Sequence, residues 1–180
     1  MKSILVHICC ANCACFPYES LKEEGFHVTG FWYNPNIHPY TEYERRLAAM
    51  KSFAGIQGLE VLYGNGYDVS GFAKNLNGDF DFPSRCESCY RMRLEAAALM
   101  AKSKNISLFT TTLLHSVHQK HELIMKIGEE IAGRHGLEFY YSDFRKGWNK
   151  GIEISKKLEL YRQQYCGCIF SEKERYVKEK

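Results

Sequence analysis

The eight cysteines of this chain are candidates for metal binding or redox chemistry, because all of them fall in three short stretches. The first stretch, "HICCANCAC", places four cysteines within residues 7–15. The second is "CESC", with Cys86 and Cys89, and the third is "CGC", with Cys166 and Cys168. Thiolates bind zinc and iron–sulfur clusters, and close thiol pairs also cycle as disulfides. The sequence therefore points to metal binding or redox chemistry.

The spacing within the pairs favours a shared centre. Cys86 and Cys89 stand three residues apart at a predicted helix start, so both sulfurs lie on one face at an end that favours thiolates. Gly167 lets the backbone bring the sulfurs of Cys166 and Cys168 around one centre. Together the stretches hold more thiols than one structural zinc uses. Spacing leaves three possibilities open: an iron–sulfur centre, a zinc site and a dithiol couple. The dithiol is disfavoured because a CxxC of the thioredoxin type normally begins the first helix of its fold.

Composition describes an ordinary globular protein that we expect to form one domain over residues 1–180. The apolar fraction is 45%, and the net charge of +3 is weak evidence for a nucleic-acid partner because 21 carboxylates dilute the basic residues. The apolar run "ILVHICC" is far shorter than the roughly 20 residues of a membrane-spanning helix and lacks the features of a signal peptide. We therefore expect a cytoplasmic protein with no membrane segment, where stable disulfides are rare.

Short apolar runs alternate with amphipathic segments along the chain. The predicted strands cover 4–10, 27–34, 59–64, 106–114 and 137–143. The predicted helices cover 18–25, 40–55, 86–104, 118–136 and 152–164. Residues 75–85 are expected to be a polar, aromatic connection. Strands separated by helices of this length predict the α/β class, with a Rossmann-like parallel sheet covered by helices on both faces.

This architecture predicts where the cysteines lie. Ligands of open parallel sheets bind outside the carboxyl ends of the strands, where the strand order reverses. Cys9 and Cys10 end the first predicted strand, "TTTLLHS" (110–116) ends the fourth, and Asp143 ends the last. We expect all of them to face one crevice.

Five separated stretches carry a family resemblance, in the same order as the family's signature blocks and over nearly the whole chain. They are "HICCANC" (7–13), "RCESCYRMRL" (85–94), "FTTTLLHSVHQKHELIMKIGEEIA" (109–132), "DFRKGW" (143–148) and "LYRQQYCGCIF" (160–170). They resemble the cobalamin-independent epoxyqueuosine reductases, the QueH family. The resemblance implies a fold of the adenine-nucleotide α-hydrolase-like (HUP) type, a [4Fe–4S] cluster, and reduction of epoxyqueuosine to queuosine in tRNA. Ile8 and Asn12 depart from the family pattern, in which cysteine and proline are common.

Two electrons are needed to remove an epoxide oxygen, and side chains cannot source them, so the reaction needs a redox centre and an external electron donor. Our hypothesis is that Cys9, Cys10, Cys86 and Cys89 hold the cluster. Cys13 is a contested member that could replace one of these ligands.

The remaining thiols receive separate expectations. Cys166 and Cys168 form a second pair, which either binds another metal ion, iron or zinc, together with Asp143 or cycles as a dithiol. Asp143 is favoured as a metal ligand or proton donor over a helix or loop cap, because of its predicted position at a strand end together with the family block that it begins. Cys15 is expected to pack inward as a small apolar side chain.

The substrate side rests on the resemblance, since without it these residues would be a solvated basic rim and ordinary aromatics. The cations expected to contact anticodon phosphates are Arg85, Arg91, Arg93, Arg145 and Lys146. Tyr90 and Trp148 are expected to stack an unpaired base. His118 and His121 are expected at the surface or as caps rather than as metal ligands.

Two alternatives belong to other functional classes. An adenine-nucleotide-dependent tRNA-modifying enzyme of similar fold would need a glycine- and serine-rich phosphate loop after the first strand, which "CCANCACFP" does not provide. A non-catalytic zinc-binding RNA adaptor would be colourless and redox-silent, and the sequence alone does not exclude it.

Overall fold

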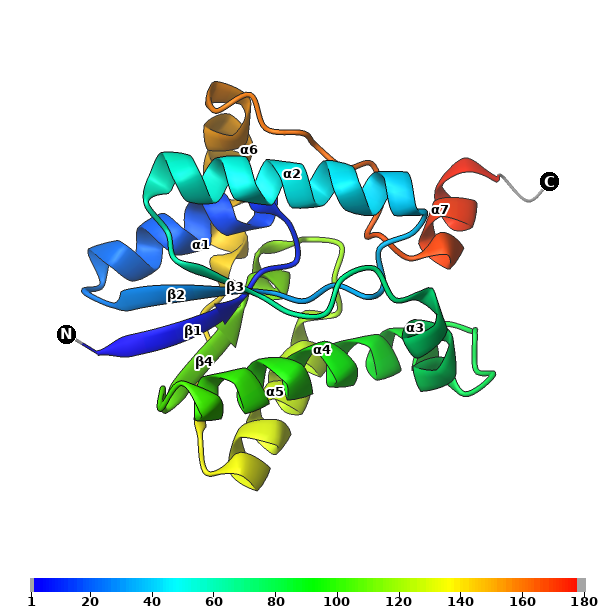
Figure 1. Cartoon of the computed structure of the whole chain (residues 1–180), viewed down its shortest axis with the longest axis horizontal. Coiled ribbons are helices and arrows are strands. Elements are labelled where there is room, and N and C mark those ends of the chain that lie inside the picture. Colours follow the sequence, from blue (N-terminus) through cyan, green and yellow to red (C-terminus); the bar gives the residue numbers. More distant parts are fainter. Residues whose placement is uncertain (1, 178–180) are drawn as a thin grey trace.

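Five parallel strands form one sheet in the computed structural model, which describes residues 2–177 (Figure 1). The strand order is β3-β2-β1-β4-β5, so β1 is central. In the register, Leu5 of β1 lies opposite Thr29 of β2 and Phe109 of β4. The strands are β1 (Ser3–His7), β2 (His27–Trp32), β3 (Val61–Tyr63), β4 (Leu108–Thr111) and β5 (Glu138–Phe139). The predicted Rossmann-like parallel sheet is confirmed.

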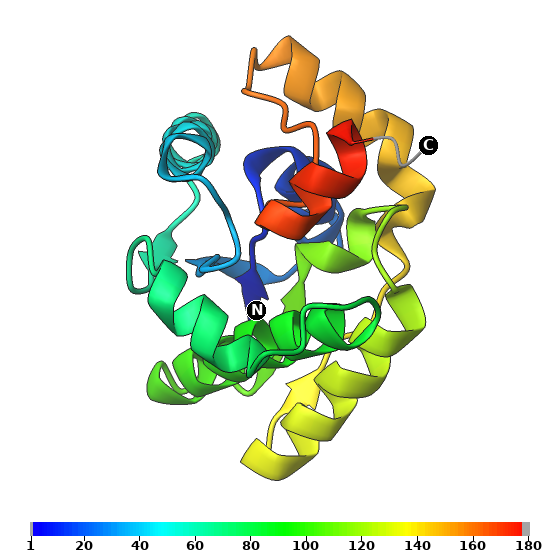
Figure 2. The same ribbon diagram turned by 90° about the vertical axis from the view of Figure 1, so that its right-hand side faces the viewer.

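Helices cover both faces of the sheet. Helices α1, α2 and α6 lie on one face, and α4 and α5 lie on the other (Figure 1). Helices α3 and α7 lie at the end of the molecule that faces the viewer in Figure 2. The α-helices are α1 (Ala11–Glu23), α2 (Tyr40–Gln57), α3 (Val69–Leu76), α4 (Ser84–Ser103), α5 (His121–His135), α6 (Trp148–Lys157) and α7 (Ile169–Tyr176). Two 3-10 helices follow β4 and β5: η1 (Thr112–His115) and η2 (Phe144–Gly147).

The central strand β1 carries a continuous apolar run, residues 4–6, because both of its faces are covered. Ile4 and Leu5 are fully buried, and β1 pairs with β2 on one side and β4 on the other. A strand buried on both faces has a continuous apolar run rather than alternation, which explains the opening "ILV". The core therefore fixes the direction of β1 and the position of the residues that follow it.

The structure differs from the prediction at the cysteine stretch. Helix α1 begins at Ala11 rather than at residue 18, because Cys10 is its N-cap: the Cys10 sulfur accepts a hydrogen bond from the Cys13 amide at 3.3 Å. The strand predicted over 106–114 is also shorter. It ends at Thr111, whose side chain accepts from the Leu113 amide at 3.1 Å and starts η1.

Helices α3 and α7 were not predicted. Helix α3 precedes the segment expected to be a connection, and α7 follows the last cysteine. Each has only 8 residues, too short for periodicity to establish a helix. Both pack near cysteines, so their omission hid part of the site.

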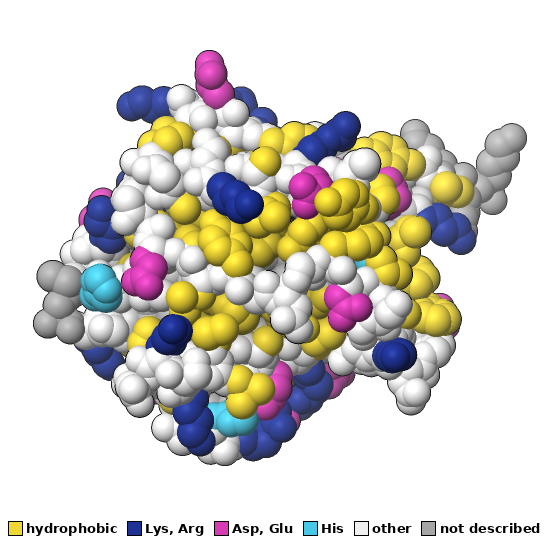
Figure 3. Space-filling view, in the orientation of Figure 1, with side chains coloured by type: hydrophobic (Ala, Val, Ile, Leu, Met, Phe, Trp, Pro, Cys, Tyr) yellow, Lys and Arg dark blue, Asp and Glu magenta, His cyan; other side chains and the backbone are white. Residues whose placement is uncertain are grey.

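Apolar side chains also gather on the surface between α2 and α4, over the edge strand β3 (Figure 3). Tyr63 of β3 and Val69 of α3 are among the exposed large apolar residues. Within the part of the chain that the structure describes, no helix combines the length and apolar character needed to cross a membrane.

Candidate functional site

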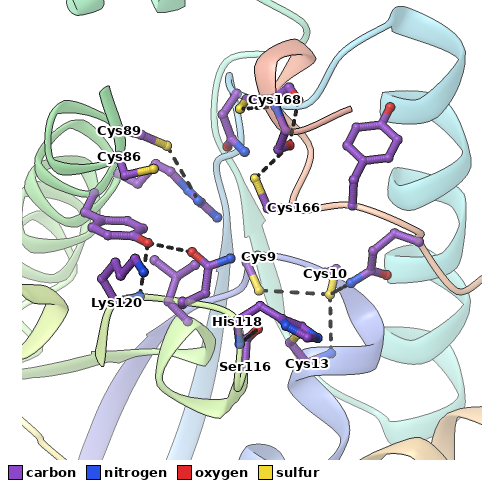
Figure 4. A pocket seen from close by; sticks show the side chains of 18 of the residues that line it. Cys9, Cys10, Cys13, Cys86, Cys89, Ser116, His118, Lys120, Cys166 and Cys168 are labelled. Carbon is purple, nitrogen blue, oxygen red and sulfur yellow. Dashed lines mark hydrogen bonds between the residues drawn. The ribbon is translucent and has the colours of Figure 1, made fainter. Parts of the chain in front are cut away.

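A cavity of about 630 Å³ opens beyond the carboxyl ends of β1 and β4, where the strand order reverses. All eight cysteines are free thiols, and seven of them line this cavity. Figure 4 shows that the thiols come from three places: the loop and helix after β1, the first turns of α4, and the segment before α7. The eighth, Cys15, is buried in α1, as expected for a small apolar side chain that packs inward. Its S–H donates to the Ala11 carbonyl at 3.4 Å.

Cys9, Cys10 and Cys13 form a compact group, called here the triad. Their sulfur atoms all lie within 4.8 Å of one another. Cys9 lies two residues after His7, the last residue of β1, Cys10 caps α1, and Cys13 is the third residue of α1. The short sequence "CCANC" therefore builds a metal-ligand geometry by itself, because the strand end and the first helical turn place the sulfurs together.

The triad thiols do not ionise independently. Hydrogen bonds from Cys10 and Cys13, with help from Arg93, hold the pKa of Cys9 well below its ordinary value. Burial raises the pKa of Cys10, and the interactions with Cys10 and Cys9 raise that of Cys13. The three thiols are therefore coupled, because the interactions that favour the thiolate of Cys9 disfavour ionisation of Cys10 and Cys13. A cation bound among the three sulfurs would allow all three to ionise, as metal binding to thiolates requires.

The other four lining cysteines, Cys86, Cys89, Cys166 and Cys168, form a second group, called here the tetrad. Cys86 and Cys89 lie one turn apart in α4, and Cys168 is the N-cap of α7, accepting from the Ser171 amide at 3.3 Å. Cys89 and Cys168 share a small apolar cluster with two side chains of α3. The unpredicted helices α3 and α7 therefore form part of the site.

The tetrad thiols differ in acidity. Burial, with the charge of Cys89, raises the pKa of Cys86 to about 11, and burial also raises that of Cys89. A hydrogen bond from Cys168, followed by one from Ser171, lowers the pKa of Cys166 to about 7. Cys166 is the one exposed thiol of the eight, so it is the most reactive of the tetrad in the apoprotein.

A buried arginine of α2 holds the "CGC" segment in place. Arg46 is 2% exposed and donates to the carbonyls of Tyr165 and Cys166, both at 3.0 Å. Its Nε donates to Glu42 at 2.7 Å. Gly167 has a φ of +129°, a backbone conformation that side-chain-bearing residues rarely adopt. Sequence reasoning missed Arg46, although its i, i+4 spacing from Glu42 is visible.

A second set of hydrogen bonds links the same segment to the triad. The Gln163 side-chain nitrogen donates to the Cys10 sulfur at 2.7 Å. Asn12 donates to the Gln163 side-chain oxygen at 2.8 Å and to the Tyr161 carbonyl at 3.1 Å. The chain before "CGC" therefore packs over the triad.

Several non-sulfur side chains line the cavity. Trp148 lies there as predicted, with His118 edge-on against it at a ring-centre distance of 5.8 Å. Lys120 also lines it, with its ammonium 4.7 Å from the ring centre of Phe82. Tyr90 is 3% exposed, and its hydroxyl donates to the Gln119 side chain at 2.7 Å. Tyr90 also lines the cavity, but in this buried position little of its ring is accessible for the base stacking expected of it.

The charged residues around Asp143 lie apart from the thiols. Asp143 caps η2 and forms an ion pair with Arg145, at 2.6 Å between its Oδ2 and an arginine nitrogen. Hydrogen bonds from Arg145 lower the pKa of Asp143 to about 2. Neither residue is among those that line the cavity, and Lys146 is exposed outside it as well. The placement gives no support to Asp143 as a ligand or proton donor.

The predicted arginines divide in the same way. Arg91 points to the surface of α4, where it pairs with Glu87 at 3.0 Å and Glu130 at 2.9 Å. Arg85 and Arg93 line the cavity and are buried. Arg85 and Arg93 therefore face the cavity, whereas Arg91 faces solvent on another side of α4. The three arginines do not form one exposed basic rim.

Comparison with known proteins gives a consistent result. The family model described as "Epoxyqueuosine reductase QueH" matches residues 4–174. The chain is 39% identical over 175 residues to an "Epoxyqueuosine reductase QueH" of Dehalococcoides mccartyi, covering 97% of this chain and 95% of that protein. It is 37% identical over 189 residues to the protein of the same name from Thermotoga maritima, covering 99% and 94%.

Among solved structures, the fold is similar to a predicted subunit of a tRNA methyltransferase from Methanocaldococcus jannaschii. The TM-score is 0.60 at 12% sequence identity, over 87% of this chain and 75% of that one. This similarity supports the Rossmann-like fold alone.

Proposed function

The chain belongs to the epoxyqueuosine reductase QueH family, and we propose that the cavity lined by seven cysteines is where it reduces epoxyqueuosine to queuosine in tRNA. The reaction breaks both carbon–oxygen bonds of the epoxide. Two electrons and two protons enter, and an alkene and one water leave. An external reductant provides the electrons, and a cytoplasmic location belongs to this proposal because tRNA is the substrate.

The observation that carries the proposal is the convergence of seven free thiols on one cavity. Thiolates suit soft metal centres, and the donor set therefore fits an iron–sulfur cluster with thiols to spare for a further ion. A bound [4Fe–4S] cluster supplies the electron transfer that side chains cannot perform. The cysteines that line the cavity would hold the cluster, and the surrounding side chains would shield it from water.

We propose that the two sulfur groups bind different metal centres. A single tetrahedral ion with metal–sulfur bonds of about 2.3 Å suits closely spaced sulfurs, and the triad sulfurs are all within 4.8 Å. A four-iron cluster is wider and suits ligands spread over two elements, as in the tetrad. The hypothesis from the sequence places the cluster instead on Cys9, Cys10, Cys86 and Cys89. Cys86 and Cys89 are ligands in both assignments.

A triad ion would be held by three thiolates, which would leave one position of a tetrahedral ion unfilled by the triad. Catalytic metal sites commonly keep such an open position for water or substrate. Iron or zinc would both suit three thiolates. We propose that the epoxide oxygen is oriented toward this part of the cavity.

The tRNA side of the proposal relies on cations and one aromatic side chain at the cavity. Lys120 and Arg175 line it and can contact anticodon phosphates, and Trp148 can stack an unpaired base. Arg91, Arg145 and Lys146 remain candidates for contacts further along the RNA. Binding of tRNA should weaken steeply with rising salt, and Lys120→Ala should reduce that slope. A flat salt response of the wild type would contradict the phosphate contacts.

The decisive assay incubates the protein anaerobically with a reductant and tRNA that carries epoxyqueuosine, followed by nucleoside mass analysis. The expected result is loss of one oxygen from the modified nucleoside. A brown preparation absorbing near 400 nm should accompany it. A colourless, redox-silent protein that binds tRNA without changing the nucleoside would instead favour the zinc-binding adaptor.

A further inference from the structure

Arg93 places a positive charge between the two sulfur groups. It lies one helical turn after Cys89 in α4, is 4% exposed and lines the cavity. One guanidinium nitrogen lies 3.8 Å from the Cys89 sulfur, an interaction drawn in Figure 4. The other donates to the Asn34 side-chain oxygen at 2.7 Å. Its Nε has no hydrogen-bond partner in the described chain.

Arg93 differs from the ion-paired arginines of this protein, because no carboxylate within residues 2–177 forms an ion pair with it. The arginines that do form one are Arg46, Arg85, Arg91, Arg134 and Arg145. Burying a charge without a counterion is energetically unfavourable. The ionisable groups around Arg93 are instead cysteines of all three stretches: Cys89, whose sulfur lies 3.8 Å away, with Cys9 and Cys166.

The position of Arg93 is fixed by an uncharged residue. Asn34 is 1% exposed, and its amide nitrogen donates to the Ile8 carbonyl at 2.8 Å, directly before Cys9. An aspartate at this position would orient the guanidinium and also neutralise it. Asparagine orients it while leaving the positive charge available to the sulfurs.

We propose that Arg93 is the fixed counterion of the iron–sulfur centre, a positioning residue that raises the potential at which the centre accepts an electron. The inference rests on the proposed function. A cluster held by four thiolates is anionic, and its charge becomes more negative by one unit when an external one-electron donor reduces it. A buried cation therefore stabilises the reduced form more than the oxidised form.

The test compares the midpoint potential of the cluster in wild type, Arg93→Met and Arg93→Lys, by anaerobic redox titration followed by electron paramagnetic resonance. At the wild-type midpoint, Arg93→Met should show a reduced-to-oxidised ratio at least about tenfold lower, equivalent to about 59 mV for one electron. Arg93→Lys keeps the charge and should recover most of the difference. Arg91→Met removes an exposed, ion-paired arginine from the same helix and should leave the midpoint unchanged.

Asn34→Asp is a second variant that leaves Arg93 in place. The new carboxylate would neutralise the guanidinium, so the midpoint should shift in the same direction as in Arg93→Met. This variant keeps the inference testable if Arg93→Met loads too little cluster to measure. A midpoint of Asn34→Asp, or of loaded Arg93→Met, equal to that of wild type would overturn the counterion role. A wild type that binds no cluster would overturn the proposed function itself.

Discussion

The triad and the tetrad use the same local device in different contexts. Cys10 caps α1 and Cys168 caps α7, and each sulfur accepts the amide hydrogen of the residue three positions later at 3.3 Å. Around Cys10 the other sulfurs come from the same five residues, next to the central strand. Around Cys168 they come from α4 and from a segment held by α2. One group is built by local sequence, whereas the other exists only once distant elements are packed.

If the tetrad binds the cluster, the loss of two of its cysteines should have the largest effect on cluster content and on activity. Cys86→Ser together with Cys89→Ser should abolish cluster binding, because both residues are ligands in either assignment. Activity should fall about a thousandfold or more, since only uncatalysed reduction would remain. Acid-labile sulfide should fall from about four per chain to near zero. Cys15→Ser is the matched control and should retain both activity and acid-labile sulfide. Full sulfide content in the double variant would refute the assignment of Cys86 and Cys89 as ligands.

The assembly of the tetrad can also be disturbed without touching a cysteine. Arg46→Met leaves Glu42 buried without its ion pair and should destabilise the fold by about 3 to 5 kcal/mol. Hydrogen exchange should rise over 160–170, with little change over 9–15. Arg45→Met, an exposed neighbour in α2, is the control. Equal loosening of both segments would mean that the two groups are not held independently.

The triad has its own supporting residue in Gln163. Gln163→Leu removes the hydrogen bond to the Cys10 sulfur and should weaken binding of the triad ion 10- to 100-fold, as loss of such supporting contacts typically does. Chelator competition would measure it, with Gln164→Leu as control. Sulfide content should not change; if it does, Gln163 supports the cluster rather than the ion.

Two thiols of the tetrad should differ in their rate of alkylation in the apoprotein, because their pKa values differ. With a pKa of about 7 for Cys166 and about 11 for Cys86, alkylation at pH 7.5 should modify Cys166 more than tenfold faster. The ratio should narrow as the pH rises, because Cys166 is already ionised while the thiolate fraction of Cys86 still increases. Peptide mass analysis would report both rates, and a ratio independent of pH would contradict these pKa values.

The local part of this molecule could be predicted from sequence, and the assembled part could not. The parallel sheet, the placement of Cys9 and Cys10 close after the first strand and the inward packing of Cys15 all follow from short-range patterns, although the strand ends at His7 rather than at Cys10. The contribution of α3, the capping by Cys168 and the Arg46 contacts depend on packing between distant elements. Asp143 shows the same limit: the strand predicted to end there stops at Phe139, and Asp143 instead caps η2 and pairs with Arg145 outside the cavity.

The most direct test of two separate metal centres is a triple variant of the triad, Cys9→Ser, Cys10→Ser and Cys13→Ser, analysed anaerobically for iron, zinc and acid-labile sulfide. Serine is itself a favourable N-cap, so α1 should still form. We expect about four sulfides per chain to remain while about one metal ion is lost. Loss of the sulfide together with the iron would contradict it and would return two cluster ligands to Cys9 and Cys10.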